Sequence, residues 1–195
     1  MVLPCMVYSQ DQREAVAHFR RVAAATDLPI MIYNNRVAYK VDLTPQSFVQ
    51  LADVKNIVAV KESSHDSRRM TDMVNVCGER YGLFCGVDDL VLENVLFGAV
   101  GWVAGLVNSF PREAVRLFEL ARDGKVDEAV ELYRWFMPLL HLDVDVKLVQ
   151  MIKLANQITG EGSEWVRGPR LTLAGEERRM VTEIVETALA NRPNL

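Results

Sequence analysis

The sequence predicts an α/β protein in which five short strands alternate with helices, followed by a helical region. Apolar runs such as Pro29–Ile32 and Ile57–Val60 are typical of strands buried on both faces. Amphipathic segments separate these runs, and such alternation implies a parallel sheet with right-handed crossovers. From Pro111 onward no further strand is predicted. We therefore divide the chain into a sheet-bearing part, residues 1–122, and a helical part, residues 123–195.

In the first part, local signals mark where each element begins. Met1–Val7 is predicted as a strand, with Pro4 suited to an edge position. Ser9 and Gln12 form a capping-box pattern ahead of a helix. Thr44 and Pro45 are typical of the N-cap and first residue of another helix. The inward face of the first helix is expected to carry Val16, Phe19, Val22 and Ala23.

Later elements follow the same logic. A helix over residues 67–76 ends before Gly78, and Asp88 is a plausible N-cap for a helix over residues 90–97. The remaining strands are predicted at 83–86 and 101–105. In the helical part, helices are predicted at 111–121, 127–142 with a kink at Pro138, 146–158 and 175–190.

Composition excludes several classes of function. The chain has 195 residues, half of them hydrophobic, and a formal net charge of −4, which predicts a soluble globular protein. The Lys and Arg residues are not gathered into a basic stripe, which argues against nucleic-acid binding. No apolar run reaches the roughly 18 residues that a membrane span needs. The cysteines Cys5, Cys77 and Cys85 lack CxxC spacing, so we expect free thiols and a cytoplasmic location. The histidines His18, His65 and His141 lack metal-ligand spacing, so no metal is expected.

Two side chains carry the candidate chemistry. Lys61 directly follows the run Ile57–Val60, and Tyr33 directly follows Pro29–Ile32. In a parallel barrel both would stand on the rim where barrel enzymes keep their active sites. Burial disfavours a charged amine, and a neutral lysine amine attacks carbonyl or imine carbons. The alternatives are a lysine that reaches out to water and a tyrosine that packs at the rim.

The number of strands leaves two architectures open. An eight-stranded barrel typically needs about 250 residues, and five strands leave a barrel with two unpaired edges. The chain is therefore either a smaller open sheet or the later part of a barrel that has lost its beginning. Met1 lies directly on a predicted strand, which favours the second interpretation.

Four segments occur in order and at suitable separations, namely 29–35, 58–64, 86–89 and 98–105. They resemble strands five to eight of the dihydrodipicolinate synthase and N-acetylneuraminate lyase family of Schiff-base (β/α)8 barrels. The resemblance covers essentially the whole chain and makes Met1–Tyr8 strand four. It implies a partial TIM barrel of strands four to eight, truncated at the N-terminus, with a C-terminal helical extension. It also implies a homo-oligomer, commonly a tetramer, and no cofactor.

A finer similarity is to the 1-pyrroline-4-hydroxy-2-carboxylate deaminase branch, a hydrolase class that forms 2,5-dioxopentanoate and ammonia. Dihydrodipicolinate synthases have an arginine at the position of Ala38 and usually a tyrosine at that of Met6. Arg36 departs from the family's proline, and Lys40 stands where a glycine often provides a positive φ. The segments that carry this similarity are Asn35–Tyr39, Val41–Pro45 and Tyr133–Asp143.

The resemblance assigns roles to four residues. Lys61 would attack C2 of a small 2-oxo or cyclic imino acid, and Tyr33 would act as general acid and base. Gly86 and Val103 match positions whose backbone carbonyls line the substrate site. Two alternatives within the family remain, a 2-oxo-3-deoxy sugar acid aldolase and a dihydrodipicolinate synthase-like enzyme. A third alternative, of another class, is a catalytically silent fragment.

Overall fold

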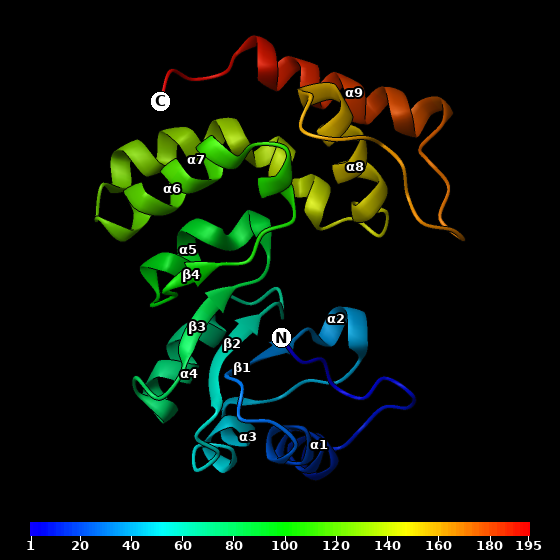
Figure 1. The fold of residues 1–195 in the computed structure, drawn as a ribbon. Coiled ribbons are helices and arrows are strands. Elements are labelled where there is room, and N and C mark those ends of the chain that lie inside the picture. The colour runs from blue at the N-terminus through cyan, green and yellow to red at the C-terminus, as the bar shows by residue number, and fades with distance from the viewer. The chain divides into compact units, whose positions relative to one another are not determined.

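The computed structural model describes residues 1–195, which form two compact units, Met1–Val103 and Ala104–Leu195 (Figure 1). The first unit contains the sheet, and the second consists of helices. Helix α6 (Pro111–Arg122) belongs to the second unit, where it packs against α7 (Val126–Leu140). The sequence had placed α6 in the sheet-bearing part.

Four parallel strands form the sheet, in the same order as in the chain. The parallel arrangement agrees with the predicted alternation of strands and helices. Within the unit, the carboxyl ends of all four strands therefore lie at one edge of the sheet. The strands are β1 (Ile30–Asn34), β2 (Ile57–Glu62), β3 (Gly82–Cys85) and β4 (Gly101–Trp102).

The predicted first strand over Met1–Val7 is wrong. Only Val2 pairs with β1, as an isolated parallel bridge to Ile32. Its amide donates to the Met31 carbonyl at 2.8 Å, and its carbonyl accepts from the Tyr33 amide at 2.9 Å. Two residues further on, Pro4 has no N–H with which to continue the ladder.

The predicted helices of the first unit lie close to their predicted positions, with two corrections, and the structure adds α2, which was not predicted. The capping box of α1 is formed by Asp11 and Glu14 and not by Ser9 and Gln12. Asp88 is not the N-cap of α5: that position is Leu90, and Asp88 lies in the preceding 3-10 turn, where its carboxylate accepts from Trp102 Nε1 at 3.0 Å. The helices are α1 (Gln12–Ala24), α2 (Arg36–Tyr39), α3 (Pro45–Gln50), α4 (Arg68–Cys77) and α5 (Val91–Leu96), the last preceded by a 3-10 turn, Asp88–Leu90.

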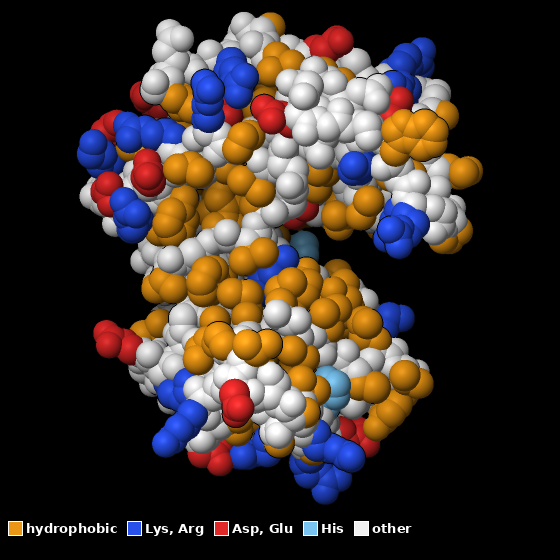
Figure 2. Space-filling model, in the orientation of Figure 1, with side chains coloured by type: hydrophobic (Ala, Val, Ile, Leu, Met, Phe, Trp, Pro, Cys, Tyr) orange, Lys and Arg blue, Asp and Glu red, His pale blue; other side chains and the backbone are white.

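The core of the first unit lies between the helices and one face of the sheet. Apolar side chains from the helices and from this face of the sheet are buried there, and their removal from water stabilises the unit. The opposite face carries Tyr33, Lys61 and Phe84 and is less covered, since these three side chains are only half-buried. Figure 2 shows apolar side chains on the viewed surface of this unit. The largest fully buried side chains of the core include Phe19, Ile32, Phe48, Ile57 and Met70.

The second unit is a helical assembly of α6, α7, α8 (Leu148–Thr159) and α9 (Gly175–Ala190). Pro138 lies inside α7 without ending it. The rings of Phe110, Trp135 and Phe136 pack together, with centroids 5.3 to 6.1 Å apart. No helix of the structure is both long and apolar enough to cross a membrane.

An ion pair ties the C-terminal residues to the second unit. Glu113 on α6 is 1% exposed and accepts a hydrogen bond from Nε of Arg192. We expect Arg192→Ala to lower the free energy of unfolding by about 1 to 3 kcal/mol, because it leaves a buried carboxylate without its partner. Thermal or urea unfolding of Arg192→Ala and of the unmodified chain would measure this loss of stability. The control is Arg179→Ala, which removes an exposed pair with Glu176, and an equal loss there would contradict the prediction.

Candidate functional site

Tyr33 and Lys61 lie side by side at the carboxyl ends of β1 and β2. The two residues are register partners in the parallel ladder. The Lys61 Nζ atom stands 4.2 Å from the centroid of the Tyr33 ring. Both side chains are half-buried. The sequence had placed a phenol and an amine at successive strand ends, and the structure brings them into direct contact.

A buried polar pair lies behind these two residues. Asn34 and Glu62 follow Tyr33 and Lys61 in the chain and are themselves register partners. Because side chains alternate along a strand, they occupy the opposite face of the sheet. Asn34 is 0% and Glu62 3% exposed, and Asn34 Nδ2 donates to Glu62 Oε2 at 2.9 Å. This bond joins the ends of the two strands that carry the candidate chemistry.

The same pair holds the loop that follows β1. The Leu43 amide donates to Asn34 Oδ1 at 2.9 Å, and Asn34 Nδ2 donates to the Leu43 carbonyl at 3.1 Å. Arg69 on α4 donates to the same carbonyl at 3.1 Å and to Asp42 Oδ2 at 2.9 Å. The loop is thereby fixed against both the strand ends and α4.

Burial dominates the electrostatics of Glu62. Loss of solvation raises the pKa of its carboxyl, while hydrogen bonds from Asn34 and Ser64 and the positive charge of Arg69 act in the opposite direction. Both carboxyl oxygens serve as acceptors, Oε2 for Asn34 at 2.9 Å and Oε1 for the Ser64 amide at 2.8 Å. The site is therefore built around an acidic group with two fixed donors.

A second tyrosine meets Tyr33 from the loop. The Tyr39 ring stands perpendicular to that of Tyr33, with centroids 5.3 Å apart. Asn35 Nδ2 donates to the Tyr33 hydroxyl at 3.4 Å. Lys40 follows with a φ of 56°, so the positive φ expected from the family pattern is present, on a lysine that adopts it at a cost of about 1 kcal/mol.

The backbone of Gly86 packs against the side chain of Lys61. A Cβ atom at Gly86 would lie 2.0 Å from Ser63 Oγ, 2.7 Å from Lys61 Cε and 2.8 Å from Lys61 Cγ. The Gly86 carbonyl accepts a hydrogen bond from Ser63 Oγ at 2.9 Å. Val103 follows β4 and is half-buried, and its amide donates to the Cys85 carbonyl at 2.9 Å. The four predicted site residues thus come from the ends of four consecutive strands.

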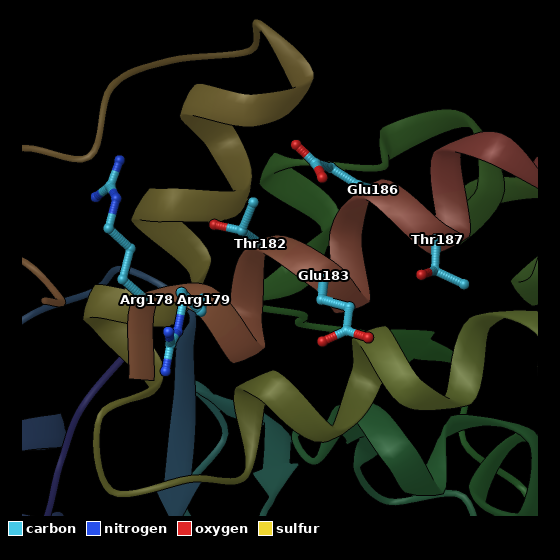
Figure 3. Close-up of a pocket in the computed structure, with 6 residues that line it drawn as sticks. All are labelled: Arg178, Arg179, Thr182, Glu183, Glu186 and Thr187. Carbon is cyan, nitrogen blue, oxygen red and sulfur yellow. The ribbon is translucent and has the colours of Figure 1, made fainter. Parts of the chain in front are cut away.

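A separate hollow exists in the second unit. It is a shallow groove of about 310 Å³ on the surface of α9, and it contains neither Lys61 nor Tyr33. Guanidinium and carboxylate groups of the same helix share it, so it offers no concentrated charge of one sign. Figure 3 shows its lining residues, Arg178, Arg179, Thr182, Glu183, Glu186 and Thr187.

Sequence reasoning missed Tyr39, Asn34 and Glu62. The signal for the last two was available, because each directly follows a predicted site residue at the end of a buried strand. A polar side chain there must point to the core face and needs a partner. Tyr39 carried no comparable signal, since its contact with Tyr33 depends on the path of the loop.

The fold and the site together define a class of protein. Parallel strands with helical crossovers, and reactive side chains at the strand carboxyl ends, are the arrangement of (β/α)8-barrel proteins. The family model "Dihydrodipicolinate synthetase family" matches residues 1–188. The chain belongs to the dihydrodipicolinate synthetase family.

Solved structures support the fold. The chain matches a putative dihydrodipicolinate synthetase from Pseudomonas aeruginosa with a TM-score of 0.89 and 28% identity, over 96% of this chain and 65% of that one. It matches dihydrodipicolinate synthase from Aquifex aeolicus with a TM-score of 0.88 and 28% identity, over 95% and 64%. The predicted fold class, part of a TIM barrel, is confirmed.

Among curated proteins, the 4-hydroxy-tetrahydrodipicolinate synthase of Methanothrix thermoacetophila is 27% identical over 90% of this chain and 60% of its own length. That of Clostridium perfringens is 33% identical over 66% of this chain and 44% of its own. The chain spans about 60% of the length of the first of these relatives. The hydrolase class implied by the deaminase branch is at odds with this family of lyases.

Proposed function

We propose that this chain carries the Schiff-base chemistry of a lyase that acts on a small 2-oxo or cyclic imino acid. The observation that carries the proposal is the contact of Lys61 Nζ with the Tyr33 ring, 4.2 Å from its centroid. It supports the proposal that an amine nucleophile and a phenolic acid act together at the rim of the sheet. Family membership supports the same chemistry.

In this mechanism the Lys61 amine attacks C2 of the substrate. With a 2-oxo acid, water leaves and a protonated imine forms, which withdraws electrons from C3 and makes its proton acidic. Tyr33 delivers and removes protons beside that carbon. Gly86 and Val103 contribute backbone groups to the substrate site.

Borohydride trapping tests the proposal. The chain is incubated with pyruvate, reduced, and examined by intact mass and peptide mapping. We expect one adduct, on Lys61, that is absent in Lys61→Ala and retained in Lys55→Ala, which removes an exposed lysine of the same unit. A folded chain that forms no adduct, or is labelled elsewhere, would contradict the assignment and favour a catalytically silent chain.

For the substrate, we propose 1-pyrroline-4-hydroxy-2-carboxylate. The support is the sequence similarity over Asn35–Tyr39 and the exposed Ala38 at the position of the synthases' arginine. The names of the relatives support the second candidate, formation of 4-hydroxy-tetrahydrodipicolinate. Product analysis separates the two, because only the first reaction releases ammonia and 2,5-dioxopentanoate.

A further inference from the structure

We propose that Phe84 is a specificity-determining residue of this site, whose ring forms the apolar floor of the substrate position and selects acids that carry no branch at C3. This inference rests on the proposed function, in which the Lys61 amine forms an imine at C2 of a small 2-oxo or cyclic imino acid. It assigns the residue that limits the size of that acid.

Phe84 stands on the same face of the sheet as the two residues of the candidate chemistry. Tyr33, Lys61 and Phe84 are successive register partners on β1, β2 and β3, and register partners on neighbouring parallel strands share a face. Gly101 on β4 is in turn the partner of Phe84. Phe84 is half-buried, so part of its surface remains uncovered on this face.

Two glycines make room for the ring of Phe84. A Cβ atom at Gly101 would lie 2.3 Å from Phe84 Cε1 and 2.5 Å from Cδ1, and one at Gly82 would lie 3.4 Å from Cε2. Because side chains alternate along a strand, these two glycines and Phe84 are the residues that β3 and β4 present on the face of Lys61. Phe84 therefore supplies the only side chain of β3 and β4 on this face.

The surroundings of the amine direct the substrate toward Phe84. On the β1 side the Tyr33 ring covers Lys61 Nζ, with its centroid 4.2 Å away, so a carbon bonded to Nζ extends over β3 and β4. The carboxylate on C2 does not lie against Phe84, because it would lose its water there and meet the negative face of the ring. C3 is the other carbon on C2 and therefore lies against Phe84, where a branch would meet the ring.

The test compares 2-oxobutanoate with 3-methyl-2-oxobutanoate, which differ by one methyl group at C3. The rate of borohydride trapping on Lys61 is measured with each acid, and the ratio of the branched to the unbranched rate is compared between variants. We expect Phe84→Ala to raise this ratio about tenfold or more. Phe84→Leu should raise it less and gives the reading if the alanine variant does not fold. The matched control, Phe97→Ala, removes a ring that is 44% exposed and should leave the ratio unchanged.

Gly101→Ala tests the position of the ring independently. Its Cβ would lift the ring away from the sheet, so the ratio should fall by a comparable factor, and this fall should vanish on a Phe84→Ala background.

Three outcomes would overturn the role of Phe84 while leaving Lys61 as the nucleophile. They are an unchanged ratio in the Phe84 variants, an equal loss of rate with both acids, and an effect of Gly101→Ala that persists without the ring. Absence of any adduct with pyruvate in the unmodified chain would instead refute the proposed function, and the specificity assigned to Phe84 with it.

Discussion

Replacing Gly86 with alanine is expected to slow borohydride trapping at Lys61 by about 100-fold, because misplacing a reacting group by about 1 Å costs that much. The added Cβ would stand 2.0 Å from Ser63 Oγ and 2.7 Å from Lys61 Cε. Both atoms belong to side chains, so they would move and the strands would remain paired. Lys61 would then leave its position over the Tyr33 ring. We expect the free energy of unfolding to fall by only about 1 to 3 kcal/mol.

Gly82→Ala provides the matched control for Gly86→Ala. Gly82 lies on β3, and a Cβ there would meet its nearest neighbours at 3.4 to 3.8 Å, which is ordinary van der Waals contact. This variant should be trapped at the rate of the unmodified chain. A Gly86→Ala protein that is trapped equally fast would show that the position of the lysine chain over Gly86 does not matter for imine formation.

Glu62→Gln is expected to lower the free energy of unfolding by about 1 to 3 kcal/mol, although it keeps the shape of the side chain. Both oxygens of Glu62 accept from N–H donors, Asn34 Nδ2 and the Ser64 amide. A glutamine must present its NH2 group to one of these donors. Asn34 cannot turn its amide without breaking its two bonds to Leu43. Denaturant unfolding measures the loss, and Glu79→Gln, at an exposed position, is the control.

The effect of Glu62→Gln is expected to depend on pH. Burial raises the folded-state pKa of Glu62 above its ordinary value of 4.5, so in the window above that value the folded chain binds more protons than the unfolded chain. The contribution of Glu62 to the free energy of unfolding therefore falls as the pH rises through this window. Glutamine does not titrate, so the difference in stability between Glu62→Gln and the unmodified chain should narrow from pH 4 to pH 7. A difference that widens would contradict the dominance of burial.

The sequence predicted most of the fold because the signals for it are local. Buried strands and amphipathic helices leave a periodic pattern of apolar residues, and this located β1, β2 and the helices α6 to α9 within a few residues. The pattern of apolar residues gave a wrong prediction where strand formation depended on hydrogen-bonded pairing with a neighbouring strand. The segment Met1–Val7 is apolar enough for a strand, but strand formation requires a continuous ladder, and only Val2 is paired.

The short helix α2 shows a second kind of limit. Its four residues, Arg36–Tyr39, are too few to show a periodic pattern, and its caps, Asn35 and Lys40, set its ends. No apolar face predicts it, because none of its residues is buried. The contact of Tyr39 with Tyr33 depends on this turn, so it appears only once the backbone of the loop is known.

By itself, the sequence determined that this chain has parallel strands with helical crossovers, and that Tyr33 and Lys61 stand at successive strand ends. Both statements depend on burial and periodicity within a few neighbouring residues. The tertiary structure alone decided that Gly86 lies beneath Lys61, that Asn34 bonds to Glu62, and that Tyr39 meets Tyr33. These contacts follow from strand register and the course of a loop, which join residues distant in the chain and leave no periodic trace in the sequence.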